Sequence, residues 1–516
     1  MHPATGRPGP RPRREPEIPS ASVIEVSGAA ELAQHTMRLF ADGHRLALVA
    51  AHHDSPHSPG GEAFRVVYLF TAGPPDRRVE LHLRADPTDP HIPSLAAMSF
   101  PASRFEREIR DMFGIEPDNH PQPRRLVHHP HWPAGWYPMR RFAGPRPPLV
   151  AAEPFPFVEV AGPGVYEIPV GPVHAGLIEP GHFRFSVVGE TILKLKARLW
   201  YVHKGIEKLA EDQFADQAIA LAERVSGDTA VGHGLAYSLA VEDATGVRVA
   251  AEAQQARALL LELERMHNHI ADLGALCNDC GYGIAHAHAQ RIRERLLRLN
   301  QRVTGHRLLR GGIFPGGAHL RELPDPAEIA AIAADAAGIV DLALNHTVVR
   351  DRFTGTAALS TQQATDIGVL GYVARASGLN HDARVAHPHV HLPADFAVSV
   401  HRDGDVLSRF LVRADELQIS AATAAALVRT VRAERWAVDL PSMGQPRAGV
   451  GIAEGWRGTI VHRIELDPGA LITRWKIVDP SFLTWPALPV ALADTIVPDF
   501  PLTNKSFNLS YAGNDL

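Results

Sequence analysis

The sequence predicts an α+β protein in which a small N-terminal α/β domain precedes a large, mainly α-helical domain with peripheral β-hairpins. Apolar runs of strand length occur near the N-terminus, at residues 46–51, 64–71 and 79–84. A wide apolar stripe over residues 250–274 indicates a long helix buried in a bundle. Strand-like segments flank tight turns at residues 187–190 and 467–469, which predicts two hairpins.

The composition favours a multidomain intracellular protein. The chain has 516 residues, 45% of them hydrophobic, so more than one domain with a sizeable core is expected. A net charge of −5 gives no reason to expect a nucleic acid partner. Cys277 and Cys280 are the only cysteines, which excludes a disulfide framework and favours a reduced, cytoplasmic location. Because no segment approaches the ~20 apolar residues of a membrane span, any attachment to a membrane should come through partner subunits.

Proline-rich segments divide the chain. Residues 1–21 are rich in proline and arginine, lack the apolar part of a signal peptide and are expected to be disordered. The first domain is expected over residues 22–145, residues 146–165 read as a linker, and residues 166–516 form the large domain. Further elements are predicted in the large domain as helices at 203–209, 291–309, 326–345, 368–376 and 414–433, and as a short strand at 396–400.

The first domain ends in an amphipathic helix at residues 105–113 and a tail rich in proline and histidine. Three histidines in this tail could suggest a metal site, but no fourth ligand is in sight. We therefore interpret the tail as a solvated loop at His128, His129 and His131.

A polar stretch at residues 223–242 is the strongest candidate for a functional site. A turn at residues 226–229 leads into a helix that is predicted to start near Gly232. Ionisable groups beside an apolar helix should be either paired or functional. Four such residues gather at the entrance of this helix: Glu223, Arg224, Asp228 and His233.

The helix and tail of the first domain carry a dense motif. ERE at 106–108, DMFGI at 111–115, HP at 120–121 and RRL at 124–126 resemble the signature of the small hydrophilic subunit of respiratory complex I. The same module is fused to the front of large subunits in formate-hydrogenlyase-type hydrogenases. The alternative is a purely structural role for these residues. The segment would then be a charged amphipathic helix whose Glu/Arg pairs stabilise it and bind a neighbouring element.

From Gly171 onward the chain resembles the catalytic large subunit of membrane-bound, energy-converting nickel–iron hydrogenases, and more distantly the related protein of complex I. The matching blocks are GPVHAGLIEPGHFRF, YVHKGIEKLAE, ERVSGDTAVGHGLAYSLAVE, ERMHNHIADLGALCND, ARASGLNHDAR, GDVLSRFLVR and WKIVDPSF. The resemblance implies an iron–sulfur partner similar to the complex I B subunit and antiporter-like membrane subunits. It also implies a hetero-oligomeric complex on the inner face of the cell membrane.

The metal centre of this family requires four thiolates from two CxxC pairs. Nickel and low-spin iron are bound by soft, anionic sulfur, and a serine or threonine hydroxyl does not ionise near neutral pH as a thiol does. Cys277 and Cys280 fall in a different block, where a redox role for the pair is the alternative to a structural one. The resemblance places hydroxyl residues at all four ligand positions: Ser226, Thr229, Ser481 and Thr484. We therefore expect no nickel–iron centre and no directly bound cofactor.

Quinone remains the other candidate cofactor. The resemblance to complex I places Ile178 and Gly227 where a histidine and a tyrosine hold the quinone headgroup, so both partners are missing. The residues that carry over suit a proton relay or conformational coupling. The alternative is a buried network of ion pairs and hydrogen bonds that holds two halves of the site together. Besides the entrance residues, the candidates are His174, Glu179, His182 and Glu242.

Three functions follow from these observations. The first is a member of a larger complex that couples electron transfer from the iron–sulfur partner to a membrane ion-translocating module. The second is a quinone-reducing subunit of the NADH dehydrogenase type, and the third is a non-catalytic scaffold.

Overall fold

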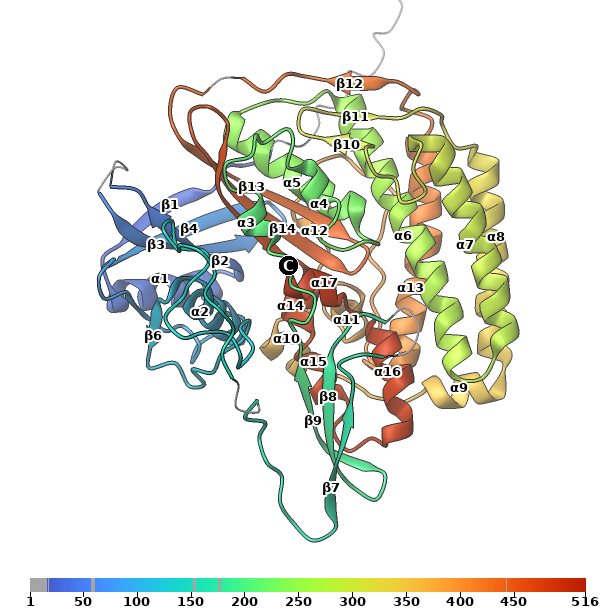
Figure 1. The fold of residues 1–516 in the computed structure, drawn as a ribbon. Helices are drawn as coiled ribbons and strands as arrows, with labels where there is room; N and C mark the ends of the chain where they lie inside the picture. The colour runs from blue at the N-terminus through green and yellow to red at the C-terminus, as the bar shows by residue number, and fades with distance from the viewer. Residues whose placement is uncertain (1–15, 17, 57–60, 152–154, 175–177, 442) are drawn as a thin grey trace, which may run out of the picture.

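The computed structural model describes residues 16, 18–56, 61–151, 155–174, 178–441 and 443–516, and it has the predicted α+β architecture (Figure 1). A small α/β domain lies beside a larger domain with long helices on its far side. The prediction that residues 1–21 are disordered falls mostly outside the described residues. Within the described ranges, no helix combines the length and the apolar character that crossing a bilayer requires.

The first domain is a four-stranded sheet in the order β1-β4-β3-β2, with β1 and β4 parallel and the other pairs antiparallel. The three predicted strands are confirmed, whereas β1 and α1 were missed by the sequence analysis. Helix α2 buries Phe105, Ile109 and Phe113 in the core. The elements are β1 (Ser22–Val26), α1 (Ala29–Ala41), β2 (Arg45–Asp54), β3 (Ala63–Ala72), β4 (Arg77–Ala85), β5 (His91–Pro93), α2 (Phe100–Phe113) and β6 (Glu116–Asp118).

The histidine-rich tail is not a solvated loop, so that interpretation is wrong for two of its three histidines. His128 is buried and His129 is half-buried, while His131 is exposed. One oxygen of the Asp111 carboxylate accepts the backbone N–H groups of residues 126–128, at 2.8, 2.8 and 3.1 Å. Arg198 of the large domain donates to backbone carbonyls of the same residues. These contacts fix the tail against the large domain.

Long helices form the core of the large domain, and α6 is buried along most of its length. The predicted helix at 326–345 has the bounds of α8, but the one predicted at 414–433 begins earlier, because the Asp405 side chain accepts from Ser408 N and caps α13. The predicted helix at 368–376 begins three residues later, as α11 (Gly371–Ala376), because Gly368 ends the preceding helix α10 with φ +80°. The strand predicted at 396–400 is irregular chain. The helices are α6 (Ala251–Asp279), α7 (Gly283–Thr304), α8 (Pro326–Asn345), α9 (Thr347–Phe353), α10 (Thr361–Ile367), α11 (Gly371–Ala376), α12 (Ala383–Ala386) and α13 (Val406–Leu427).

A three-stranded antiparallel sheet, β13-β14-β15, packs against α5. Two glycines of β13 permit this close approach. A Cβ atom at Gly451 would lie 1.9 Å from the Ala236 carbonyl oxygen, and one at Gly449 would lie 2.2 Å from that of Ala240. The backbone of the helix therefore rests directly on the strand. The elements are α5 (Ala230–Thr245), β13 (Arg447–Gly455), β14 (Gly458–Leu466) and β15 (Ile472–Val478).

Both predicted hairpins are confirmed. The first lies in the sheet β7-β8-β9, which projects from the body of the molecule, and the second is β14-β15. The last helix, α17, lies near the centre of the view in Figure 1, beside α14. The remaining elements are β7 (Val165–Val170), β8 (His182–Val188), β9 (Thr191–Arg198), α3 (Ile206–Leu209), α4 (Ile219–Ala222), β10 (Ile313–Phe314), β11 (Gly317–His319), β12 (Arg435–Ala437), α14 (Pro480–Thr484), α15 (Ala487–Ala491), the 3₁₀ turn Val497–Asp499, α16 (Phe500–Phe507) and α17 (Tyr511–Asp515).

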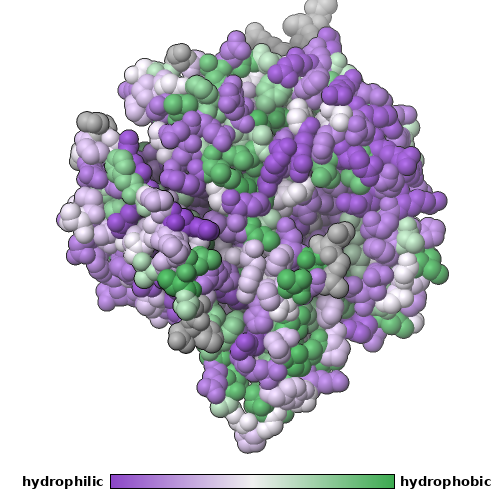
Figure 2. All heavy atoms as spheres, in the orientation of Figure 1, coloured by the Kyte–Doolittle hydropathy of each residue, from purple (hydrophilic) through white to green (hydrophobic). Residues whose placement is uncertain are grey.

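Ion pairs between strands of the two sheets join the two domains. The Arg463 guanidinium is 2.8 Å from a Glu80 oxygen, and the Arg65 guanidinium is 2.9 Å from Glu465. The Lys476 ammonium group lies 2.6 Å from Glu108 of α2. Arg463 and Lys476 are buried. The outer surface in Figure 2 is largely hydrophilic, with apolar residues scattered among the polar ones.

Candidate functional site

The four hydroxyl residues of the predicted site come from two segments that the fold brings together through Ser510. The Ser226 and Ser510 Oγ atoms are 2.8 Å apart, and the Ser510 backbone N–H donates to Ser481 Oγ at 3.0 Å. Thr229 precedes α5, and Thr484 ends α14 and accepts from Leu370 N at 3.3 Å. All four hydroxyl residues are buried. We call them the hydroxyl quartet.

Arg457, which the sequence analysis missed, occupies the edge of the quartet. It lies in the turn between β13 and β14, and it donates to both oxygens of Asp228, at 2.6 and 2.7 Å. The same guanidinium reaches Thr229 Oγ1 at 3.3 Å. Asp228 also accepts from the Ser226 and Thr229 hydroxyls, at 2.9 and 3.0 Å. Although burial acts in the opposite direction, Arg457 holds the pKa of Asp228 well below its usual range.

The residues at this position do not fit a nickel–iron centre. Such a centre needs anionic sulfur donors, whereas the quartet supplies neutral hydroxyls that are engaged in hydrogen bonds. In the described part of the chain, no group of three or more His, Cys, Asp or Glu side chains is placed to hold a metal ion.

A chain of three buried side chains runs behind the quartet. Asp479 caps α14 by accepting from Ser481 N at 2.7 Å, and its other oxygen is 3.0 Å from His233 Nε2. His233 Nδ1 is in turn 3.0 Å from His462 Nε2. All three residues are buried to 0% exposure.

The protonation of this chain follows from its geometry. Although burial acts in the opposite direction, the hydrogen bond from His233 lowers the pKa of Asp479, so the carboxylate accepts and His233 Nε2 donates. His233 Nδ1 and His462 Nε2 share the second hydrogen bond, whose donor is set by the tautomers of the two rings. Burial lowers the pKa of His462 well below its usual value, so that ring is neutral. The hydrogen bonds provide a path for a proton between Asp479 and His462.

The sequence analysis missed His462 because it stands in an apolar strand, GTIVHRIEL. A polar residue in the middle of a buried strand was the available signal, since buried polar groups are normally hydrogen-bonded.

Three predicted site residues lie around β8 rather than in the quartet. His174 Nε2 is 2.9 Å from the Gly181 carbonyl oxygen, and His182 Nδ1 is 3.1 Å from that of Gly171. These contacts hold Gly171 and His174 against Gly181 and His182. Glu179 reaches toward the site, because its carboxylate accepts from the N–H of Ala512 in α17 at 3.0 Å.

Three further candidates form hydrogen bonds with neighbouring backbone or side-chain groups. Glu223 accepts from Gly311 N at 2.6 Å, and burial raises its pKa. Arg224 is exposed and donates to the Ala220 carbonyl. Glu242 forms two hydrogen bonds with the buried Arg257, at 2.6 and 2.9 Å. The role of every candidate in a relay stays a prediction; the structure places Asp228 against the quartet and His233 against Asp479.

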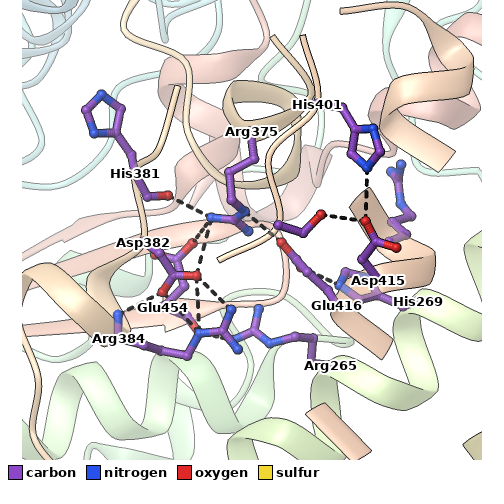
Figure 3. A network of polar contacts seen from close by, with 12 residues as sticks. Arg265, His269, Arg375, His381, Asp382, Arg384, His401, Asp415, Glu416 and Glu454 are labelled. Carbon is purple, nitrogen blue, oxygen red and sulfur yellow. Dashed lines mark hydrogen bonds and ion pairs between the residues drawn. The ribbon is translucent and has the colours of Figure 1, made fainter. Parts of the chain in front are cut away.

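A buried charge network holds the turn that carries Arg457 (Figure 3). Arg375 donates to Glu416 at 2.6 Å and to Glu454, the penultimate residue of β13, at 2.8 Å. Glu416 also contacts His269 Nε2 at 2.7 Å. Arg265 donates to the backbone carbonyls of residues 454 and 455 at 2.7 and 3.0 Å. The backbone just before Trp456 and Arg457 is therefore fixed from two helices, α6 and α11.

The two cysteines lie at the end of α6, apart from the quartet. Cys277 is buried and both thiols are free. Burial raises the pKa of Cys277 to about 12 and that of Cys280 to about 11, so both remain protonated and unreactive. We expect neither to be alkylated by iodoacetamide near neutral pH in the folded protein, and both to react in urea. Rapid labelling of the native protein, measured by mass spectrometry, would contradict this.

Comparisons with known families agree with the two-domain description. Residues 25–145 match the respiratory-chain NADH dehydrogenase 30 Kd subunit, and residues 279–450 match the 49 Kd subunit. Residues 204–277, which include Ser226 and Thr229, match the nickel-dependent hydrogenases.

Individual relatives cover most of the chain. Formate hydrogenlyase subunit 5 of Escherichia coli is 32% identical over 85% of this chain and 79% of its own length. The C/D subunit of the NADH-quinone oxidoreductase of Phocaeicola vulgatus is 30% identical over 64% of this chain and 68% of its own. A chain of the membrane-bound sulfane sulfur reductase, an archaeal respiratory membrane complex, superposes with a TM-score of 0.64 at 25% identity and covers 68% of this chain and 99% of that one. The chain therefore belongs to the family of large subunits that formate-hydrogenlyase-type hydrogenases share with the fused C/D subunits of complex I.

Proposed function

We propose that the chain is the large subunit of a membrane-attached oxidoreductase complex in which it couples electron transfer to ion translocation without a nickel–iron centre of its own. The electrons would come from an iron–sulfur partner similar to the complex I B subunit. Antiporter-like membrane subunits would hold the complex on the inner face of the membrane. The observation that carries this proposal is the hydroxyl quartet, whose neutral, hydrogen-bonded oxygens stand where the family's chemistry needs thiolates.

Within this proposal, the described residues supply proton handling. Asp479, His233 and His462 form a hydrogen-bonded chain that can shift a proton when the charge nearby changes. Ser510 links that region to α17, and Glu179 contacts the next residues of the same helix. A change of charge at the quartet therefore has a direct route to the loop around β8. This arrangement suits coupling better than catalysis on hydrogen.

A quinone held as in complex I has less support. Ile178 and Gly227 offer no side-chain hydrogen bond at the two headgroup positions.

Metal analysis of the purified complex tests the proposal. We expect iron and acid-labile sulfide from the partner subunit but only trace nickel, even after growth in nickel-supplemented medium. The complex should also lack hydrogen uptake with an artificial dye. The iron content serves as the internal control for cofactor loss. Nickel in a one-to-one ratio with the chain would overturn the proposal.

A further inference from the structure

The buried charge network behind Arg457, most of which Figure 3 shows, contains more acidic than basic side chains. Its members come from α6, α11, α13, β13 and the start of α12, and each is at most 6% exposed. Four carboxyl groups face three guanidiniums: Glu262, Asp382, Glu416 and Glu454 against Arg265, Arg375 and Arg384. If all of these groups were ionised, the network would carry one uncompensated negative charge.

An uncompensated charge at this depth is unfavourable, because the surrounding protein replaces the water that would stabilise it. Such a network binds a proton unless a further cation pairs with it. Arg45 of β2 approaches from the first domain, where burial lowers its pKa and Glu454 acts in the opposite direction. Among the described residues no ion pair joins Arg45 to the network, so it does not compensate the charge directly. The other ionisable groups beside the network are neutral or paired: His381, His389 and the pair Arg413–Asp272.

Glu454 is the carboxyl group with the weakest claim to a cation. It shares its only guanidinium, Arg375, with Glu416. Burial raises the pKa of Glu454, and the neighbouring Asp382 adds to this effect. Although burial acts in the opposite direction, guanidinium partners hold the pKa of Glu262, Asp382 and Glu416 below their usual values. The count of charges and the direction of these shifts therefore agree.

His269 is the alternative holder of the proton, since its Nε2 lies 2.7 Å from Glu416. Burial lowers the pKa of His269, although Glu416 acts in the opposite direction, so the ring is neutral. The proton on Glu454 also has a partner of its own. Thr459 Oγ1 is 2.7 Å from Glu454 Oε2, and a hydroxyl oxygen can accept as well as donate.

We propose that Glu454 is a proton-binding residue that holds one proton in the folded protein at neutral pH and releases it when positive charge increases beside the quartet. Unlike an organic ligand, a proton needs no open space next to the oxygen that binds it. Glu454 stands two residues before Trp456, whose Nε1 donates to Thr229 Oγ1 at 3.1 Å, and three before Arg457. The proton site does not depend on the proposed function, but its use in coupling rests on that function.

Infrared spectroscopy of the purified full-length chain at pH 7 tests the proposal, because a protonated carboxyl group has a C=O stretch that a carboxylate lacks. We expect Glu454→Gln to remove the intensity of one acid group per chain from this band. The matched control is Glu80→Gln, since Glu80 is also buried but is held ionised by Arg463, 2.8 Å away. No loss in Glu454→Gln, or an equal loss in Glu80→Gln, overturns the proposal.

Glu416→Gln tests the count of charges. It removes one negative charge and leaves Arg375 to pair with Glu454, so Glu454 should ionise and the same band should disappear although Glu454 is present. A band that persists in Glu416→Gln contradicts the proposal. This variant also decides the matter if circular dichroism shows that Glu454→Gln does not fold.

Asp228→Asn tests the coupling to the quartet. It removes a carboxylate and leaves the Arg457 charge unpaired, so the pH at which the Glu454 band is lost should fall by about one unit. An unchanged titration overturns the coupling, whereas the metal content of the complex tests the proposed function independently.

Discussion

Replacing Arg375 with methionine is expected to lower the free energy of unfolding by about 3–5 kcal/mol, because it leaves buried carboxylates without their partner. Arg375 is fully buried and pairs with Glu416 and Glu454, which are themselves buried. Because methionine fills much of the volume of the arginine side chain, the loss of unfolding free energy measures the effect of the unpaired charges rather than that of a cavity. Urea unfolding followed by circular dichroism measures the change.

The control for Arg375→Met is Arg298→Met. The Arg298 side chain is 74% exposed and pairs with Glu294 on the surface of α7. Removing such a pair should change the unfolding free energy by no more than ~0.5 kcal/mol. Combining Arg375→Met with Glu416→Leu should cost less than the sum of the two single changes, since the second removes an unpaired charge left by the first. Equal effects of the buried and exposed substitutions would contradict the role given to this network.

The unfolding free energy should fall as the pH drops from about 6.5 toward 4, and two buried histidines should each contribute about 1.4 kcal/mol per pH unit. Burial lowers the pKa of His267 and of His389 from 6.5 to about 4. In this window the unfolded chain binds a proton at each position and the folded chain does not. Acid therefore favours unfolding. Above about pH 6.5 both states leave the two histidines unprotonated, so their contribution to the unfolding free energy no longer changes with pH.

Glutamine variants isolate this effect. In His389→Gln or His267→Gln, the slope of unfolding free energy against pH between about 6.5 and 4 should decrease by up to ~1.4 kcal/mol per unit relative to the parent. His131→Gln is the control, because His131 is exposed. Identical slopes in the parent and in both buried-site variants would refute the assignment, whatever their stability at neutral pH.

The fold was predictable where periodicity and turn residues act locally. The helix at 326–345 has a side-chain cap at Asp325 and an apolar stripe, and its bounds were predicted correctly. The start of α13 was missed although Asp405 stands directly before apolar residues with helical spacing, such as Val406 and Phe410. The buried state of His128 was missed because it depends on Asp111 and Arg198, which are distant in sequence. Local patterns carry no information about such contacts.

The candidate site was only half predictable. Ser226, Thr229, Ser481 and Thr484 could be found because the resemblance aligns them with ligand positions. Arg457 and His462 were missed, since Arg457 lies in the turn between two strands, and the polar side chain of His462 in a buried strand signals a buried hydrogen bond without naming its partner. Their roles depend on Asp228 and His233, more than 200 residues away in the chain. Only tertiary structure brings these groups within hydrogen-bond distance.

The ion pairs between the two domains bear on why they share one polypeptide. Arg463 and Lys476 are buried against Glu80 and Glu108. In either domain alone, these charged groups would therefore be exposed to water or left without a partner of opposite charge. The ion pairs therefore stabilise the contact between the two domains. The linker keeps one domain close to the other and so raises its effective concentration there. The fusion also fixes the ratio of the two domains, since every copy of the large domain is made together with one copy of the small domain.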